Sequence, residues 1–119
     1  MTTPIADFVK NYAQREISRF HMPGHKGKKM LGCERLDITE IDGADVLYHP
    51  QGILAQSQNI ARDLFGAKKT LFSAEGSSLS IRAMLYLAQL DAKQRGRSQT
   101  VLAARNAHKV FLLSSALLR

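Results

Sequence analysis

The order of apolar segments between Thr70 and Ala104 constrains the fold of this chain most strongly. Residues 70–72 have the composition of a short strand, residues 77–90 that of a long apolar helix, and residues 100–104 that of a second strand. This order and spacing predict a βαβ unit with two parallel strands. Because parallel sheets need several strands with cover on both faces, we expect these residues to belong to a larger α/β domain.

The turn before the apolar helix carries residue types that suit an anion. Gly76, Ser77 and Ser78 follow the first expected strand, and a helix start leaves several backbone N–H groups without intrahelical partners. Glycine lets the backbone come close to a ligand, and the two hydroxyls add donors. The pattern predicts a phosphate-binding turn, and ordinary N-capping by serine is the alternative interpretation. Neither common nucleotide-binding fingerprint is present.

Further helices are expected on both sides of this unit. Thr3 followed by proline predicts a helix start, and the apolar stripe that follows extends to about Glu16. Residues 53–65 predict a second helix and residues 109–118 a last one. Residues 37–43 alternate acidic and apolar side chains, which indicates an extended segment or short strand.

Residues 19–32 predict a loop with an unusual content of glycine, histidine and lysine. His21 and His25 lie in it and Cys33 follows, but this spacing is poor for metal ligands, so no metal site is expected. The density of histidine and lysine, including Lys26, suggests a contact surface for an anion or carboxylate. A simple solvated loop is the alternative.

Composition limits the class of protein. The net charge of +7 would suit a protein that binds nucleic acid. However, the basic residues are scattered and do not interleave with aromatic ones, so nucleic acid is not expected as a partner. The single cysteine excludes an internal disulfide and fits a reducing compartment. No apolar run has the length of a membrane span. We therefore expect a cytoplasmic protein without a membrane partner.

Four motifs together resemble the N-terminal part of the ornithine/lysine/arginine decarboxylase family, whose members use pyridoxal phosphate on the aminotransferase-like fold, called fold type I. They span nearly the whole chain: RFHMPGHKG (19–27), DITEIDGADVLYHPQG (37–52), LFGAKKTLFSAEGSS (64–78) and RNAHKV (105–110). The resemblance implies an incomplete fold type I α/β domain with an N-terminal helix, an extended loop region and the first βαβ of a mainly parallel sheet. It divides the chain into an N-terminal helix and loop segment, 1–36, and the start of the cofactor-binding major domain, 37–119.

The resemblance also implies roles for single residues. Gly76, Ser77 and Ser78 stand where the family binds the cofactor phosphate, and His108 stands where a histidine stacks on the pyridine ring.

Other positions follow the family less closely. His25 and Lys26 lie in a loop that the family places near the substrate entrance or the dimer contact. Glu75 and Ile81 stand where family members commonly have asparagine.

The resemblance further implies an N-terminal fragment of a basic amino acid decarboxylase that forms a homo-oligomer. In the family, the lysine that binds the cofactor covalently lies downstream of residue 119, so no catalytic residue is assigned and the fragment is expected to be inactive alone. Two alternatives from other classes are a small basic module that binds nucleic acid and a non-catalytic partner of a full-length decarboxylase. The residues do not indicate which basic amino acid is the substrate.

Overall fold

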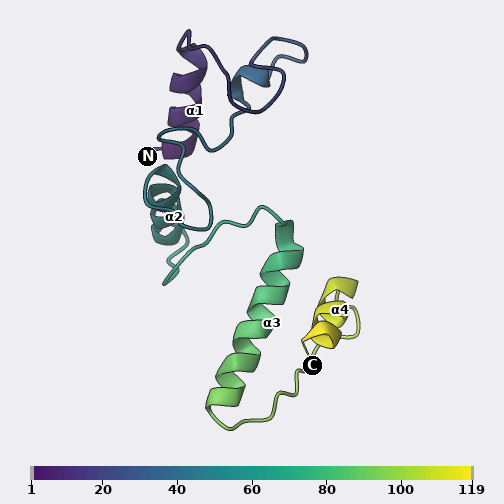
Figure 1. The fold of residues 1–119 in the computed structure, drawn as a ribbon. Coiled ribbons are helices and arrows are strands. Elements are labelled where there is room, and N and C mark those ends of the chain that lie inside the picture. The colour runs from purple at the N-terminus through teal and green to yellow at the C-terminus, as the bar shows by residue number, and fades with distance from the viewer. Residues whose placement is uncertain (1, 119) are drawn as a thin grey trace. The chain divides into compact units, whose positions relative to one another are not determined.

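The computed structural model describes residues 2–118, which divide into two units at residues 72 and 73. The described residues form four α-helices and one short 3-10 helix (Figure 1). Each unit is described separately below.

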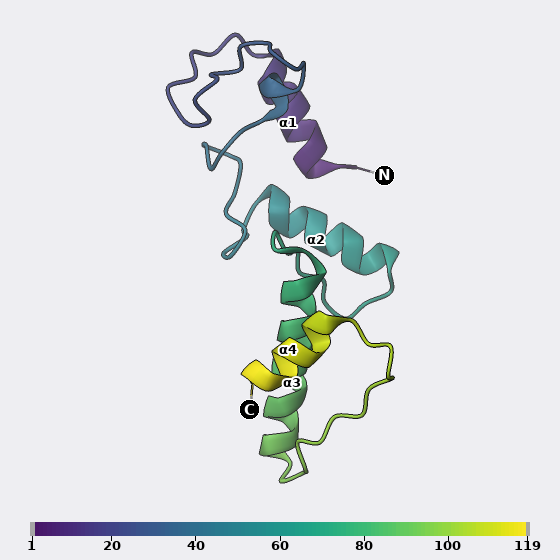
Figure 2. The same cartoon turned by 90° about the vertical axis from the view of Figure 1, so that its right-hand side faces the viewer.

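The first unit contains α1 (Pro4–Gln14), the 3-10 helix η1 (Glu34–Leu36) and α2 (Ile53–Leu64). Helix α1 contacts both η1 and α2, and a long loop returns the chain from α1 to η1 (Figure 2). The expected apolar stripe on α1 explains these contacts, because a helix with one apolar face must pack against another element.

The predicted helices of this unit are confirmed with small shifts at their ends. Helix α1 begins at Pro4 as expected and ends two residues before Glu16. Thr3 does not cap it through its side chain; its Oγ1 instead donates to Oδ1 of Asp7 at 2.9 Å. Helix α2 covers the predicted range to within one residue, and Gly66 follows it with φ +59°.

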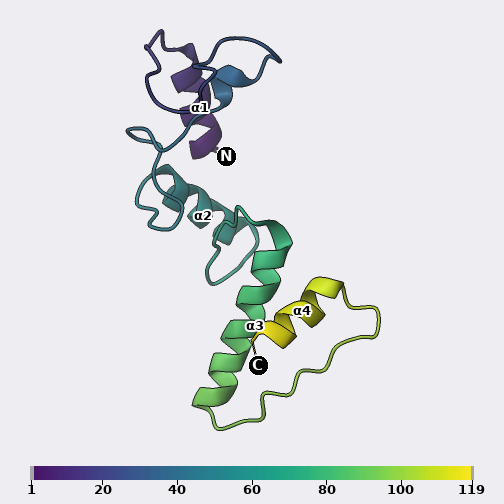
Figure 3. The ribbon, with the colours of Figure 1, turned by 45° about the vertical axis from the view of Figure 1, so that its right-hand side comes forward.

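The second unit contains α3 (Gly76–Gln94) and α4 (Lys109–Leu117), which lie against each other (Figure 3). A segment without regular secondary structure leads from the end of α3 to the start of α4. Gln89 links α3 to the connecting segment and to the end of α4. Its Nε2 donates to Oε1 of Gln99 at 3.1 Å and to the carbonyl oxygen of Leu118. Both helices were predicted, and α3 continues four residues past its expected end.

The predicted α/β class was wrong for the part of the chain that the structure describes. Residues 70–72 and 100–104 form no strand, so the first βαβ of a parallel sheet is absent from residues 2–118. Residues 37–43 form no strand either. Apolar composition sets only a local preference, whereas a strand exists through hydrogen bonds to a neighbouring strand. Without such neighbours these side chains stay in solvent, and Leu102 is 95% exposed.

Candidate cofactor site

The start of α3 is open to solvent and lacks a side-chain cap. Gly76 has φ +64°, and a Cβ atom built there would meet no atom within 4 Å. Glu75 occupies the N-cap position but makes no capping hydrogen bond. The hydroxyl of Ser73 accepts from the Glu75 N–H at 3.2 Å, one residue short of the helix. The first amides of α3 are therefore not occupied by a side chain, and Ser77 is exposed beside them.

These residues fit the phosphate end of pyridoxal phosphate. Uncapped amides, a glycine without Cβ and two adjacent hydroxyls, Ser77 and Ser78, are the donors that an anion at a helix start requires. Glu75 also places a carboxylate at this end of the helix, and its charge opposes that of a phosphate.

His108 is fixed by a different helix. It is the N-cap of α4, and its Nδ1 accepts a hydrogen bond from the Val110 N–H at 3.3 Å. Because Nδ1 accepts, the ring in this arrangement carries its proton on Nε2. No hydrogen bond in the described residues joins His108 to residues 76–78. A cavity of about 680 Å³ lies between α3 and α4, and its lining includes neither His108 nor residues 76–78. The structure therefore does not bring the two predicted parts of the site together.

His25 is held within its own loop. Its Nδ1 accepts from the Gly27 N–H at 3.0 Å, and its Nε2 lies 3.0 Å from Oδ2 of Asp37. Since Nδ1 is an acceptor, Nε2 carries the proton and donates to the carboxylate. His25 thus links the loop to the segment after η1.

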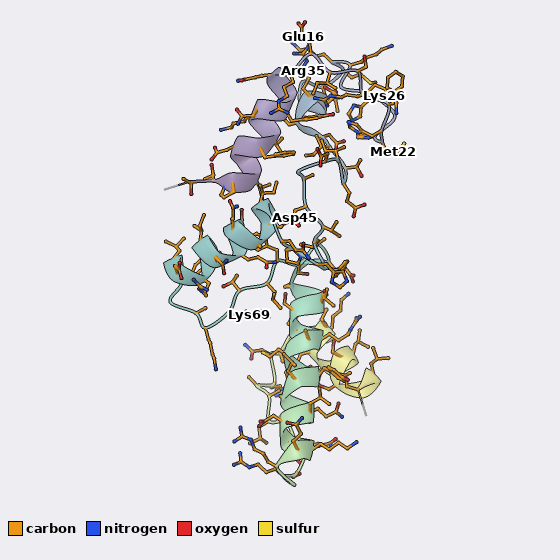
Figure 4. The ribbon with its side chains drawn as sticks, turned by 60° about the vertical axis from the view of Figure 1, so that its left-hand side comes forward. Glu16, Met22, Lys26, Arg35, Asp45 and Lys69 are labelled. Carbon is orange, nitrogen blue, oxygen red and sulfur yellow. The ribbon has the colours of Figure 1, made fainter. Side chains whose placement is uncertain are left out.

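Lys26 also bonds locally. It has φ +53°, and its Nζ donates to the carbonyl oxygens of Phe20, at 3.3 Å, and His21. Figure 4 shows it on the loop between α1 and η1 together with Met22. Both weak entrance candidates therefore help to shape this loop.

Arg19 organises the loop and was not predicted as a key residue. Its guanidinium lies 4.8 Å from the centroid of the Tyr12 ring and donates to the carbonyl oxygens of Glu34 and Arg35, at 3.4 and 2.8 Å. Gly27 has φ +73°, a left-handed conformation that favours glycine, and a Cβ atom there would also lie 3.0 Å from Nη1 of this group. Bonds to carbonyls twelve or more residues away leave no local sequence pattern.

Glu34 is a buried carboxylate, only 7% exposed. It accepts hydrogen bonds from the N–H groups of Leu31 and Gly32, the latter at 2.9 Å. These bonds, led by that from Leu31, lower the pKa of Glu34 to about 2.

Asp45 is a second carboxylate that accepts backbone hydrogen bonds, and it lies near the start of α2 (Figure 4). Its carboxylate accepts from four backbone N–H groups at 2.8–3.0 Å, those of Val46, Gln51, Gly52 and Leu54. The bond from Gln51 leads the causes that lower the pKa of Asp45 to about 2. Asp45 also has φ +68°, a left-handed conformation that aspartate tolerates better than most residues.

Residues 2–118 contain neither a metal-binding cluster nor a membrane-spanning helix. No three His, Cys, Asp or Glu side chains gather as a set that could hold a metal ion. No helix within this range has the length and apolarity needed to cross a membrane.

The family model described as "Orn/Lys/Arg decarboxylase, major domain" matches residues 3–118. The chain belongs to the Orn/Lys/Arg decarboxylase family. It is 32% identical to "Arginine decarboxylase" of Bacillus subtilis (strain 168) and 32% identical to "Arginine decarboxylase" of Halalkalibacterium halodurans, in each case over 92% of this chain and 23% of the relative. It is 30% identical to "Uncharacterized protein YaaO" of Bacillus subtilis (strain 168), with the same coverage. No solved structure gave a significant match.

This family membership confirms the resemblance found in the four sequence motifs. The chain spans about a quarter of the length of the curated relatives it matches.

Proposed function

We propose that this segment opens the major domain of a pyridoxal-phosphate-dependent decarboxylase of a basic amino acid. Membership of the Orn/Lys/Arg decarboxylase family supports the reaction class. Several relatives carry the name arginine decarboxylase, which makes arginine the first substrate to test.

In this proposal the start of α3 binds the cofactor phosphate through Gly76, Ser77 and Ser78, and His108 lies against the pyridine ring. When bound, the cofactor supplies the electron sink that accepts the electrons left by departing carbon dioxide. The supporting observation is the uncapped, open start of α3, where Gly76 has φ +64° with free space around it. The imidazole of His108 accepts a hydrogen bond at Nδ1 from the α4 backbone, which leaves Nε2 and the faces of the ring without a hydrogen bond from described residues.

His25 and Lys26 are proposed to act at the substrate entrance as parts of a shaped loop. Their side chains already bond to Asp37 and to loop carbonyls, so the proposed role is to hold the loop in one form. We also propose a homo-oligomer in a cytoplasmic location. The major domain is proposed to begin at residue 37.

Residues 1–119 by themselves are proposed not to decarboxylate. The resemblance assigns the lysine that binds the cofactor covalently to a part of the family's sequence that residues 1–119 do not match. Release of carbon dioxide from arginine, lysine or ornithine by the purified 119-residue chain would refute this.

The cofactor assignment is tested in the protein that carries this segment, by release of labelled carbon dioxide from arginine. Ser77→Ala/Ser78→Ala is expected to raise the concentration of pyridoxal phosphate needed for half-maximal activity about tenfold, because two donors to the phosphate are lost. Ser80→Ala, an exposed serine on the same helix, is the matched control. An unchanged cofactor requirement in the double variant would contradict the phosphate site. Activity toward lysine or ornithine but not arginine would correct only the substrate.

A further inference from the structure

A cavity with basic side chains lies in the first unit. A cavity of about 550 Å³ opens between α2 and the segments before and after it. Its lining combines polar and apolar residues with three basic ones and includes no acidic residue: Tyr48, Pro50, Ala55, Gln58, Asn59, Arg62, Lys68, Lys69, Thr70 and Leu71. The volume is within the range of small-molecule sites.

Gln58 is the unusual member of this lining. It is only 8% exposed and is the one buried residue of α2, yet its side chain makes no hydrogen bond to a described residue. Its amide atoms are open to solvent, because Ser114 Oγ is the one buried side-chain polar atom left without a hydrogen bond in the described residues. Since Gln58 lines the cavity, its NH2 group can donate to water or to a molecule bound there.

The charges around Gln58 indicate the sign of that molecule. Lys68 and Lys69 follow α2 and form no ion pair within the described residues; Lys69 is labelled in Figure 4. Arg62 is partly neutralised, because its Nη2 lies 2.7 Å from Oδ1 of Asp63, but its Nη1 is directed to Asn59 of the lining at 3.2 Å. The cavity therefore presents two uncompensated ammonium groups and amide donors.

We propose that this cavity binds a small phosphate-bearing anion, independently of the cofactor site. Lysine ammonium groups bind phosphate as point charges, and the side-chain amides of the lining supply directed donors. The cavity has room for an organic phosphate or a diphosphate as well as for a single phosphate group.

The test uses the 15N-labelled 119-residue chain titrated with inorganic pyrophosphate and followed by NMR. We expect saturable shifts of the Gln58 side-chain NH2 signals. Lys68→Ala/Lys69→Ala is expected to weaken binding about tenfold or more, because two charge-assisted contacts are lost. Lys28→Ala/Lys29→Ala removes the same charge from another exposed loop and is expected to leave binding within about twofold. Equal weakening in both double variants, or no movement of the Gln58 signals, would overturn the proposal.

Two further variants separate this proposal from other outcomes. Gln58→Glu keeps the side chain's size but places a carboxylate in the cavity, so it is expected to abolish pyrophosphate binding while circular dichroism stays unchanged. Full binding by that variant would overturn the proposal. Ser77→Ala/Ser78→Ala is expected to leave the Gln58 shifts intact. The proposed cofactor site and the proposed anion cavity can therefore be disproved separately. A single-stranded oligonucleotide that binds more tightly than pyrophosphate without moving the Gln58 signals would overturn the proposal in favour of a general polyanion surface.

Discussion

At the scale of single residues, two carboxylates hold the first unit in place by accepting backbone hydrogen bonds. Asp45 reaches four N–H groups at the approach to α2, and Glu34 reaches two before η1. A charged acceptor forms stronger hydrogen bonds with N–H groups than a neutral one. Loss of charge at either carboxylate should therefore lower the stability of the chain.

Asp45→Asn is expected to lower the melting temperature of the chain by several degrees. Asparagine tolerates the left-handed φ of +68°, so the change removes charge and one acceptor oxygen without adding backbone strain. Thermal unfolding followed by circular dichroism measures the effect. Asp42→Asn, an exposed acid in the same segment, is the control. If both variants melt together with the wild type, Asp45 does not stabilise α2.

Stability should also fall in acid in a defined pH range. The pKa values of Glu34 and Asp45 are lowered to about 2 in the folded chain, against about 4 for an unfolded carboxyl. A lowered pKa gives stability that is full above the unfolded value and is lost as the pH falls through the folded value. The melting temperature should therefore decline between about pH 4 and pH 2. Asp45→Asn should flatten this decline; an equally steep decline would show that other groups cause it.

At the scale of elements, the helices were predictable and the strands were not. Pro4 after Thr3, and Gly66 after α2, are local signals that act within one helical turn, and both helices lie where these signals put them. The extended segments 70–72 and 100–104 depend on neighbours far along the chain, which local composition does not report.

In the candidate site, too, local features were predictable from the sequence and contacts between distant residues were not. The uncapped start of α3 follows from Gly76 and the two serines after it, which form a local pattern. Apart from the Asp45 bond with adjacent Val46, the bonds made by Arg19 and Asp45 cross six to sixteen residues, so no spacing rule revealed them. The basic cavity around Gln58 likewise forms only when α2 and its flanking segments come together.

Gly76→Ala tests the conformation at the start of α3. The left-handed φ of +64° costs a residue with a Cβ atom about 1–2 kcal/mol, even though the space around it is open. Chemical denaturation should show this loss. Gly24→Ala has equally open surroundings and no positive φ, so it should be nearly neutral. Equal stability of the two variants would mean that α3 starts in another conformation.

Gln89→Ala tests how the second unit is held together. Its amide joins α3 to Gln99 and to Leu118, and losing these bonds should cost about 1–2 kcal/mol. Hydrogen exchange measured by NMR should then show faster exchange in α4, with little change in α1. Unchanged protection of α4 would show that apolar contacts alone hold the two helices.

At the scale of the whole molecule, large apolar side chains remain exposed on both units. Phe20 and Leu31 are 92% and 91% exposed in the first unit, and Leu87 is 63% exposed on α3. Helix α3 is apolar nearly all round, but Leu85 is its one buried residue in the described structure. Exposed apolar side chains such as these are consistent with the proposed larger domain and homo-oligomer, in which they would be covered.

In the proposed function, the start of α3 recognises the phosphate of the cofactor. NMR of the 15N-labelled chain with pyridoxine 5′-phosphate tests it directly, because this compound lacks the aldehyde that would react with lysines. Amide shifts at Gly76, Ser77 and Ser78 that appear with pyridoxine 5′-phosphate and not with pyridoxine are the predicted result. Equal shifts with both compounds, or no shifts at these three amides, would contradict the account.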